Sequence, residues 1–312
     1  MELQKSGTAI DRLYAAIKEK GNPSAAGLDT WLEYVPEGSK ADTFARASKL
    51  ILEYNKRLID ALYDIIPAVK VQAACYEMYG HEGMKAFAET LEYAKSRGLI
   101  TIADVKRGDT GDTSQAYARA YLGKTALGES EKAAFDVDFA TVNAYLGSDG
   151  VQPFIDQCRE HKKGIFILVK TSNLSSGQLQ DLFANGKPLY ETMGEYVMQW
   201  GSGIMGRCGY SSIGAVVGAT YPAQGEALRK KLKGVFFLVP GYGMQGGKGS
   251  DIAGCFDDNG MGAIVNASRS ILLAYRNPDN RGMDPESAAR KEALRMREDI
   301  SEALKNAGKY RF

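Results

Sequence analysis

The stretch Ile100-Thr-Ile-Ala-Asp104-Val-Lys106-Arg-Gly-Asp109 begins as an apolar run rich in β-branched residues and ends in a dense set of charges. A short apolar run of this kind that stops at polar residues is typical of a buried strand in a parallel sheet. Period two along a strand points Asp104 and Lys106 to the same side. We therefore expect a strand that delivers opposite charges to one place at its carboxyl end.

Similar apolar runs recur along the chain and are separated by amphipathic segments such as Thr43–Tyr63 and Met84–Ser96, which have the spacing of helices. The eight expected strands are Ser24–Leu28, Ala68–Gln72, Ile100–Val105, Phe139–Val142, Gly164–Val169, Ile213–Val217, Val235–Val239 and Ala263–Asn266. Uninterrupted alternation implies a parallel α/β sheet, and about eight units close a TIM (β/α)8 barrel. An open doubly wound sheet is the alternative.

The 312 residues contain neither a Ser/Pro-rich linker nor a compositional break, so we expect residues 1–312 to form a single barrel domain. Residues 171–209 are longer than an ordinary βα connection, and we expect an elaborated loop with its own helix there. The charged stretch Pro285–Lys305 is expected to form a helix with a solvated face.

Composition narrows the functional classes. The net charge of +1 gives no electrostatic footprint for nucleic acid or an anionic membrane. Four dispersed cysteines and two distant histidines disfavour a disulfide framework, a histidine metal site and a Ser-His-Asp triad. Neither a signal peptide nor an apolar run of membrane-spanning length is apparent, so we expect a cytoplasmic protein whose chemistry uses lysine and carboxylates.

Active sites of TIM barrels lie at the carboxyl ends of the strands. The first five expected strands end in or carry charged and amide residues, which are Asp29, Lys70, Asp104 with Lys106, Asn143 and Lys170. The last three end in glycine-rich segments and an arginine, which are Gly218-Ala-Thr220, Pro240-Gly-Tyr-Gly243 and Ala267-Ser-Arg269. This division suggests a reaction centre on one side of the barrel and a phosphate site on the other.

A lysine ammonium held between carboxylates is poised to donate a proton, because neighbouring charges shift the pKa of each group. Ordinary surface ion pairs are the alternative for Asp104 and Lys106, but Lys70 lies within an apolar strand, where lysine is rarely found unpaired.

The glycine-rich segment Gly241-Tyr-Gly243-Met-Gln-Gly246 matches a dinucleotide fingerprint, yet it lies in the seventh unit instead of the first. We interpret it as an anion-binding loop assisted by Arg269, with turn-forming glycines as the alternative.

These strand-end residues resemble those of orotidine 5′-phosphate decarboxylases, a family that removes carbon dioxide from orotidine 5′-phosphate in pyrimidine nucleotide synthesis. The likeness spans the chain and rests on Ala26-Gly-Leu-Asp29, Lys70, Asp104-Val-Lys106-Arg-Gly-Asp109 with Thr113, Lys170-Thr-Ser-Asn173, Gly218-Ala-Thr220, Pro240-Gly-Tyr-Gly243 with Gln245, and Arg269. The fourth of these segments resembles the longer bacterial branch. Thr110 departs from the isoleucine that is usual after Asp109, which changes the polarity expected beside the substrate carboxylate.

The resemblance implies a role for each matching residue. Lys106 is implied as proton donor, with Asp104 beside the leaving carboxylate and Lys70 and Asp109 holding the lysine. Substrate contacts are implied for Asp29 at the ribose, Ser172 at the pyrimidine, and a phosphate-binding half made of Gly218, Thr220, Gly241, Tyr242, Gln245 and Arg269. It also implies a homodimer in which Asp109 and Thr113 reach the partner's site, and a reaction without cofactor or metal.

Three other functions remain open at this point. A metal-dependent sugar-phosphate decarboxylase or aldolase on the same barrel would need additional acids. A non-catalytic barrel that binds a phosphorylated ligand would not need Lys106, Asp104 and Lys70. A nicotinamide-dependent reductase would place its glycine fingerprint early in the chain.

Overall fold

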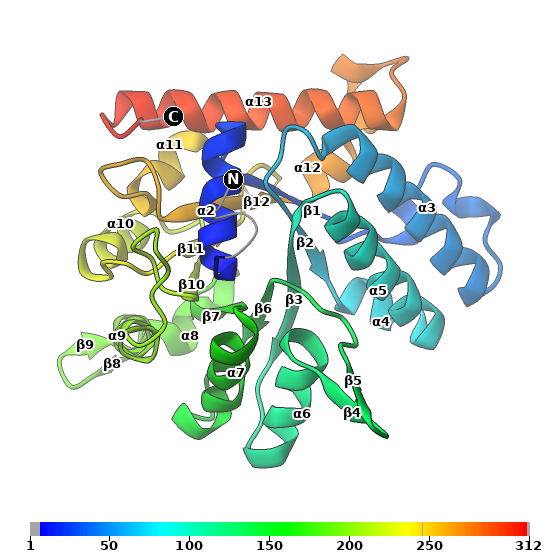
Figure 1. The fold of residues 1–312 in the computed structure, drawn as a ribbon. Helices are drawn as coiled ribbons and strands as arrows, with labels where there is room; N and C mark the ends of the chain where they lie inside the picture. The colour runs from blue at the N-terminus through cyan, green and yellow to red at the C-terminus, as the bar shows by residue number, and fades with distance from the viewer. Residues whose placement is uncertain (1–6, 245, 311–312) are drawn as a thin grey trace.

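Eight parallel strands close into a ring at the centre of the molecule, which confirms the predicted TIM (β/α)8 barrel (Figure 1). The computed structural model describes residues 7–244 and 246–310. In chain order the barrel strands are β1 (Ser24–Gly27), β2 (Ala68–Gln72), β3 (Ile100–Arg107), β6 (Phe139–Val142), β7 (Gly164–Lys170), β10 (Ile213–Val217), β11 (Phe237–Pro240) and β12 (Ala263–Ala267). Each barrel strand pairs with the barrel strands that precede and follow it in the chain, and β12 pairs with β1 to close the ring.

Three expected strands, the second, fourth and sixth, have the predicted bounds. The largest differences concern β3, which continues to Arg107 beyond the predicted Val105, and β11, which begins at Phe237 instead of Val235. The longer β3 carries Lys106 on the strand itself.

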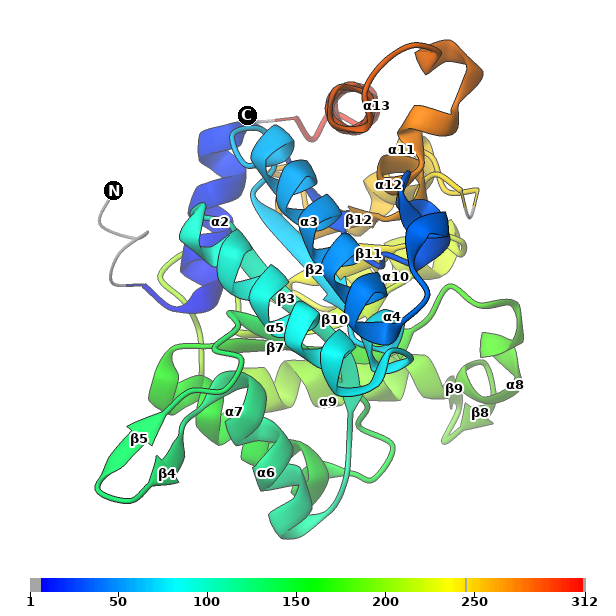
Figure 2. The ribbon, with the colours of Figure 1, turned by 90° about the vertical axis from the view of Figure 1, so that its right-hand side faces the viewer.

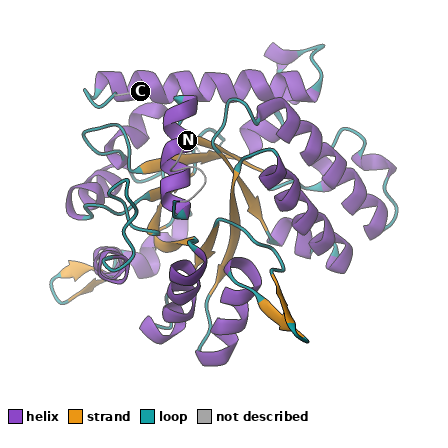
Figure 3. Cartoon of the chain, viewed as in Figure 1, coloured by secondary structure: helices purple, strands orange, loops and turns teal. Residues whose placement is uncertain are grey.

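Helices surround the ring of strands, as Figure 3 shows by colour. The helices are α2 (Ala9–Lys20), α3 (Phe44–Leu62), α4 (Ala74–Glu77), α5 (Gly80–Ser96), α6 (Gly111–Leu122), α7 (Ser148–His161), α8 (Gly177–Gln180), α9 (Leu189–Gly201), α10 (Pro222–Lys231), α11 (Gly249–Ile252), α12 (Arg269–Leu272) and α13 (Pro285–Asn306). The Thr43 hydroxyl caps α3 by accepting from the Arg46 amide at 3.2 Å, which explains why the predicted helix starts where it does. Within the described residues no helix is long and apolar enough to cross a membrane.

The inside of the barrel is filled by its own side chains. Phe139 and Phe166 stack with ring centroids 5.0 Å apart, and glycines on neighbouring strands make room for them. A Cβ atom on Gly214 would lie 2.6 Å from the Phe166 ring. Helix α2 adds Ile10 and Leu13 to the same apolar cluster and packs against the amino-terminal end of the barrel (Figure 2).

Residues 171–209 form an irregular segment followed by a regular wall helix. The segment contains α8 and the hairpin of β8 (Phe183–Ala184) with β9 (Lys187–Pro188), and it projects from one side of the barrel (Figure 2). Helix α9 packs on β7 and β10 and therefore serves as the helix of this βα unit. The additional structure is thus shorter than the expected 171–209 and ends near Pro188. A second hairpin, β4 (Thr125–Leu127) with β5 (Ser130–Lys132), follows α6.

Candidate active site

The carboxyl ends of the barrel strands surround a cavity of about 770 Å³, which we call the mouth cavity. Its lining includes eight of the residues predicted from the sequence, which are Asp29, Lys70, Asp104, Lys106, Ser172, Gly241, Tyr242 and Arg269. It also includes residues that the sequence analysis did not single out, among them Trp31, Tyr34, Gln72, Thr141, Asn266 and Ser268. Segments far apart in the chain thus meet in one concave site, as expected for a barrel enzyme.

Asp104 is the centre of a polar network on one wall of the mouth cavity and is only 7% exposed. Its Oδ1 atom accepts hydrogen bonds from Lys106 Nζ at 2.5 Å and from Thr141 Oγ1 at 2.9 Å. Its Oδ2 atom accepts from Lys70 Nζ and from Gln72 Nε2, both at 3.0 Å. The carboxylate is therefore held by two cations and two neutral donors.

The network continues from Lys70 toward the end of β12. Lys70 Nζ donates to Asp29 Oδ1 at 2.8 Å, and the Ser268 hydroxyl donates to Asp29 Oδ2 at 2.7 Å. Asn266 Nδ2 in turn donates to the Ser268 hydroxyl at 3.2 Å. The Asn266 Oδ1 atom is buried and accepts no hydrogen bond from the described residues.

Opposite charges keep this wall ionised. Burial by itself would raise the pKa of Asp104, but the ammonium groups of Lys70 and Lys106 hold it well below its usual range. Burial by itself would lower the pKa of Lys70, but Asp104 and Asp29 raise it above its usual value. Asp104 is therefore a carboxylate and Lys70 an ammonium across the physiological pH range.

A bulge in β3, and not regular period two, brings Asp104 and Lys106 together. The pairing of β3 with β6 shifts between Ala103, which faces Ala140, and Arg107, which faces Val142. Lys106 has a φ of +46°, in the left-handed region that residues with side chains rarely adopt. The prediction that the two side chains meet is correct in outcome, but its reason was wrong, because the strand is irregular at this point.

Ser172 marks the wall contributed by the end of β7 and the segment after it. Gly218 and Thr220 lie behind Ser172 instead of lining the mouth cavity. The Thr220 hydroxyl donates to the Ser172 carbonyl at 3.0 Å, and a Cβ atom on Gly218 would lie 2.8 Å from the Ser172 backbone. These two residues therefore support the Ser172 backbone.

The glycine-rich loop after β11 forms the rim next to Arg269. Gly241 has a φ of +99°, a conformation that suits glycine and lets the backbone approach a ligand. Tyr242 lines the cavity, but its hydroxyl donates to Asp299 Oδ2 of α13 at 2.6 Å and is directed away from a ligand role. Arg269, the first residue of α12, is exposed, and Gln245 lies outside the described residues.

Asp109 and Thr113 lie on the loop and helix beyond β3 and do not line the mouth cavity of their own chain. The Asp109 Oδ1 atom accepts from the Thr110 amide at 2.8 Å, and Thr113 is exposed in the first turn of α6. Thr110, the departure noted in the sequence, is the exposed N-cap residue of α6.

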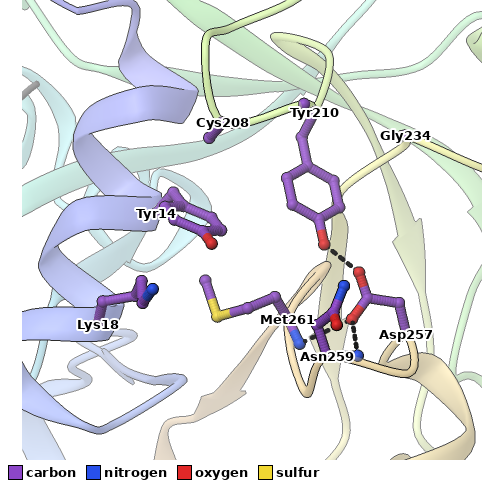
Figure 4. A pocket seen from close by; sticks show the side chains of 9 residues that line it. Tyr14, Lys18, Cys208, Tyr210, Gly234, Asp257, Asn259 and Met261 are labelled. Carbon is purple, nitrogen blue, oxygen red and sulfur yellow. Dashed lines mark hydrogen bonds between the residues drawn. The ribbon is translucent and has the colours of Figure 1, made fainter. Parts of the chain in front are cut away.

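A second cavity of about 510 Å³ lies at the other end of the barrel, between α2 and the loops before β10, β11 and β12 (Figure 4). Its one carboxylate, Asp257, accepts from the Tyr210 hydroxyl and from the amides of Asn259 and Met261, at 2.9 and 3.0 Å for the two amides. These bonds fold the loop and leave little for a ligand. The mouth cavity, with its charged wall, is therefore the candidate active site.

Neither cavity offers a ready metal site. In residues 7–244 and 246–310, no three His, Cys, Asp or Glu side chains are arranged to hold a metal ion. The two acids of the mouth cavity, Asp29 and Asp104, instead pair with Lys70.

Comparison with known proteins links this chain to one family. Residues 47–282 match the model of the Orotidine 5′-phosphate decarboxylase / HUMPS family. The chain is 40% identical over 296 residues to the orotidine 5′-phosphate decarboxylase of Clostridium tetani. This match covers 95% of this chain and 98% of the relative. The orotidine 5′-phosphate decarboxylase of Caldicellulosiruptor bescii is 42% identical over 274 residues, and the match covers 86% of this chain and 90% of that relative. The solved structure of Leishmania donovani OMP decarboxylase matches with a TM-score of 0.69 and 28% identity, over 93% of this chain and 99% of that one.

The charge network predicts a pH-dependent stability difference for Asp104→Asn. At pH 7 the free energy of unfolding of the variant should be about 3 kcal/mol lower than that of wild type, because the substitution leaves the buried Lys70 with only part of its compensating charge. The pKa of Asp104 is lower in the folded than in the unfolded state, so its contribution is present above about pH 4 and is lost as the pH falls further. The difference in the free energy of unfolding between wild type and variant should therefore decrease below pH 4, as measured by urea titrations followed by tryptophan fluorescence. A gap that is constant from pH 7 to pH 3 would contradict this account.

Proposed function

The chain belongs to the orotidine 5′-phosphate decarboxylase family and has its carboxy-lyase activity, and we propose that Lys106 supplies the proton that replaces the departing carbon dioxide. The observation that carries this assignment is the position of the Lys106 ammonium. It lies in the mouth cavity, 2.5 Å from Asp104, with 44% of its side chain exposed. A cation that is fixed at one side and open to a ligand on the other can act as a general acid.

The reaction breaks the bond between a pyrimidine ring carbon and the carboxylate. The electron pair of that bond stays on the ring carbon as carbon dioxide leaves, and no adjacent electron sink disperses it. The Lys106 ammonium stabilises this negative charge and then transfers one proton to the carbon, which leaves a neutral lysine to be protonated again from solvent. The product is uridine 5′-monophosphate.

The other charged residues hold the donor and the substrate. Asp104 would lie beside the leaving carboxylate, and its hydrogen bond orients the Lys106 ammonium. Lys70 fixes Asp104 from the buried side and joins it to Asp29, to which we assign the ribose hydroxyls. We assign Ser172, on another wall, to the pyrimidine.

The phosphate is assigned to the rim formed by Gly241 and Arg269, and Gln245, which lies outside the described residues, is assigned to the phosphate from the sequence alone. Arg269 offers a planar guanidinium suited to a phosphate dianion, and Gly241 allows close approach of the backbone. Because the Tyr242 hydroxyl is held by Asp299, we assign this residue to fixing the loop, with Gly218 and Thr220 as support for Ser172. Binding at this rim is distant from the reacting bond and can order the site for the reaction.

The active assembly in this proposal is a homodimer whose sites are shared. Asp109 and Thr113 do not line the cavity of their own chain, which agrees with a role in the partner's site.

The proposed location is the cytoplasm, where thiols stay reduced. The four cysteines are all free, which agrees with this location; they are Cys75, Cys158, Cys208 and Cys255. No step uses a cofactor or a metal ion. A metal-dependent reaction on the same barrel would need free acids, whereas Asp29 and Asp104 are engaged by lysine.

Decarboxylation is tested by the loss of ultraviolet absorbance of orotidine 5′-phosphate, with and without a chelator. Wild type should turn over equally in both, and Lys106→Ala should lose activity by at least about 10²- to 10⁴-fold because the general acid is gone. Lys106→Arg keeps the positive charge but cannot release a proton, so it should be nearly as inactive. The control is Lys132→Ala, on the exposed hairpin strand β5, which should behave as wild type. Wild-type turnover by Lys106→Ala would refute the proton-donor role, and inhibition by the chelator would favour the metal-dependent reaction.

The phosphate assignment predicts that Arg269→Ala raises KM for orotidine 5′-phosphate by about 10- to 150-fold, the equivalent of losing one or more charge-assisted hydrogen bonds worth about 1.5–3 kcal/mol. On orotidine, which lacks the phosphate, wild type and Arg269→Ala should have the same kcat/KM. The matched control is Arg281→Ala, at an exposed arginine in the segment between α12 and α13. An equal loss on both substrates would show that Arg269 does not contact the phosphate.

The shared site predicts complementation between inactive homodimers. After subunit exchange between Lys106→Ala and Asp109→Ala, half of the dimers are mixed and each has one intact site, so activity should return to about a quarter of wild type. Lys106→Ala mixed with Asp104→Ala is the control, because both residues line the same barrel and no intact site forms. Exchange is verified by mass spectrometry. If both mixtures stay inactive, Asp109 acts within its own chain.

A further inference from the structure

The bulge in β3 places three residues opposite one. Between the pairs Ala103–Ala140 and Arg107–Val142, residues 104–106 of β3 face only Thr141 of β6. A bulge of this kind leaves backbone amides without their usual partners in the neighbouring strand. Such amides are costly when buried, so the structure must supply acceptors for them.

The Thr141 side chain supplies what the bulge lacks. Its hydroxyl oxygen accepts hydrogen bonds from the Val105 and Lys106 amides, both at 2.9 Å. The hydroxyl then donates its proton to Asp104 Oδ1 at 2.9 Å. Thr141 is 1% exposed, so water cannot easily replace these bonds.

The hydroxyl group is used to capacity in this arrangement. A threonine hydroxyl has one proton and two lone pairs. The two amides occupy the lone pairs, so the proton can point only toward Asp104. Because Thr141 is β-branched, its side chain also has few rotamers available. One atom therefore fixes both the carboxylate that binds the Lys106 ammonium and the backbone from which Lys106 extends.

We propose that Thr141 is a positioning residue that holds Lys106 and Asp104 in register for proton transfer. The proposal rests on the function assigned above, in which Lys106 is the donor. Lys106 adopts an unfavourable positive φ of +46°, and such a conformation persists only where neighbouring contacts impose it. Without the Thr141 hydroxyl the bulge can relax, and a displacement of about 1 Å at a reacting group can cost about 100-fold in rate.

The structure provides a matched control on the same two strands. At the amino-terminal end of β3, the Thr101 hydroxyl donates to Asp138 Oδ2 at 3.1 Å and accepts from the Asp138 amide at 3.1 Å. Thr101 is also 1% exposed and also links β3 to the segment that enters β6. It differs from Thr141 in lying far from the mouth cavity, so a purely structural role of the hydroxyl should give the same result at both sites.

The experiment compares Thr141→Val, Thr141→Cys, Thr141→Ser and Thr101→Val in kcat, KM, affinity for uridine 5′-monophosphate and thermal midpoint. We expect Thr141→Val to lower kcat by about 30- to 100-fold while KM and product affinity change by less than about threefold, as for an interaction that matters in the transition state. Thr141→Ser, which keeps the hydroxyl, should stay within about threefold of wild type in kcat. Thr141→Cys, whose thiol is a weak donor and acceptor, should be intermediate. Thr101→Val should lose thermal stability but keep kcat.

Two results would overturn the proposal. One is a kcat for Thr141→Val that matches that of Thr101→Val, and the other is a kcat for Thr141→Ser as low as that of Thr141→Val. If Thr141→Val does not fold, the comparison of kcat between Thr141→Ser and Thr141→Cys tests the proposal. Equal kcat values for these two variants would show that the hydrogen bonds of the hydroxyl do not matter. Wild-type enzyme that releases no carbon dioxide from orotidine 5′-phosphate would instead refute the proposed function itself.

Discussion

The buried carboxylate of Asp104 is the constraint on which the rest of the site depends. An ionised carboxylate that is 7% exposed is costly unless charges and hydrogen bonds compensate it, and here two lysines and two neutral donors do so. These four donors come from β2, β3 and β6, so only strands held side by side in a fixed register can supply them. The charge network therefore depends on the closed barrel.

Closure of the barrel joins the charged half of the site to the half that is proposed to bind phosphate. Strand β12 pairs with β1, which places the Ser268 hydroxyl 2.7 Å from Asp29, a residue 239 positions earlier in the chain. Arg269 follows Ser268 directly, so the proposed phosphate contact and the proposed ribose contact are linked through one hydrogen bond. This connection explains how binding at the rim can influence residues near the reacting bond.

The sequence predicted the barrel and most of the charged wall because both have strong local signals. Apolar runs that end in charges mark the strands, and a lysine within such a run, Lys70, marks a buried ion pair. Thr141 and Gln72 escaped notice because neutral residues on a strand carry no such signal. The bulge was missed for a similar reason, since Lys106 adopts a positive φ where the sequence offers no glycine. The direction of the Tyr242 hydroxyl depends on Asp299, 57 residues later, and only the folded chain shows it.

The two lysines of the network have different surroundings, and this difference supports the separate roles proposed for them. The Lys70 side chain is 4% exposed and its ammonium lies between Asp29 and Asp104, so a proton lost from it would leave two buried carboxylates poorly compensated. The Lys106 side chain is 44% exposed and pairs with Asp104 alone among the described residues, so its proton can reach a ligand in the mouth cavity. In the proposed reaction, Lys70 would still compensate Asp104 after the transfer, while solvent would restore the proton on Lys106. In this proposal, a pair of lysines around one carboxylate separates the group that maintains the charge of the site from the group that donates the proton.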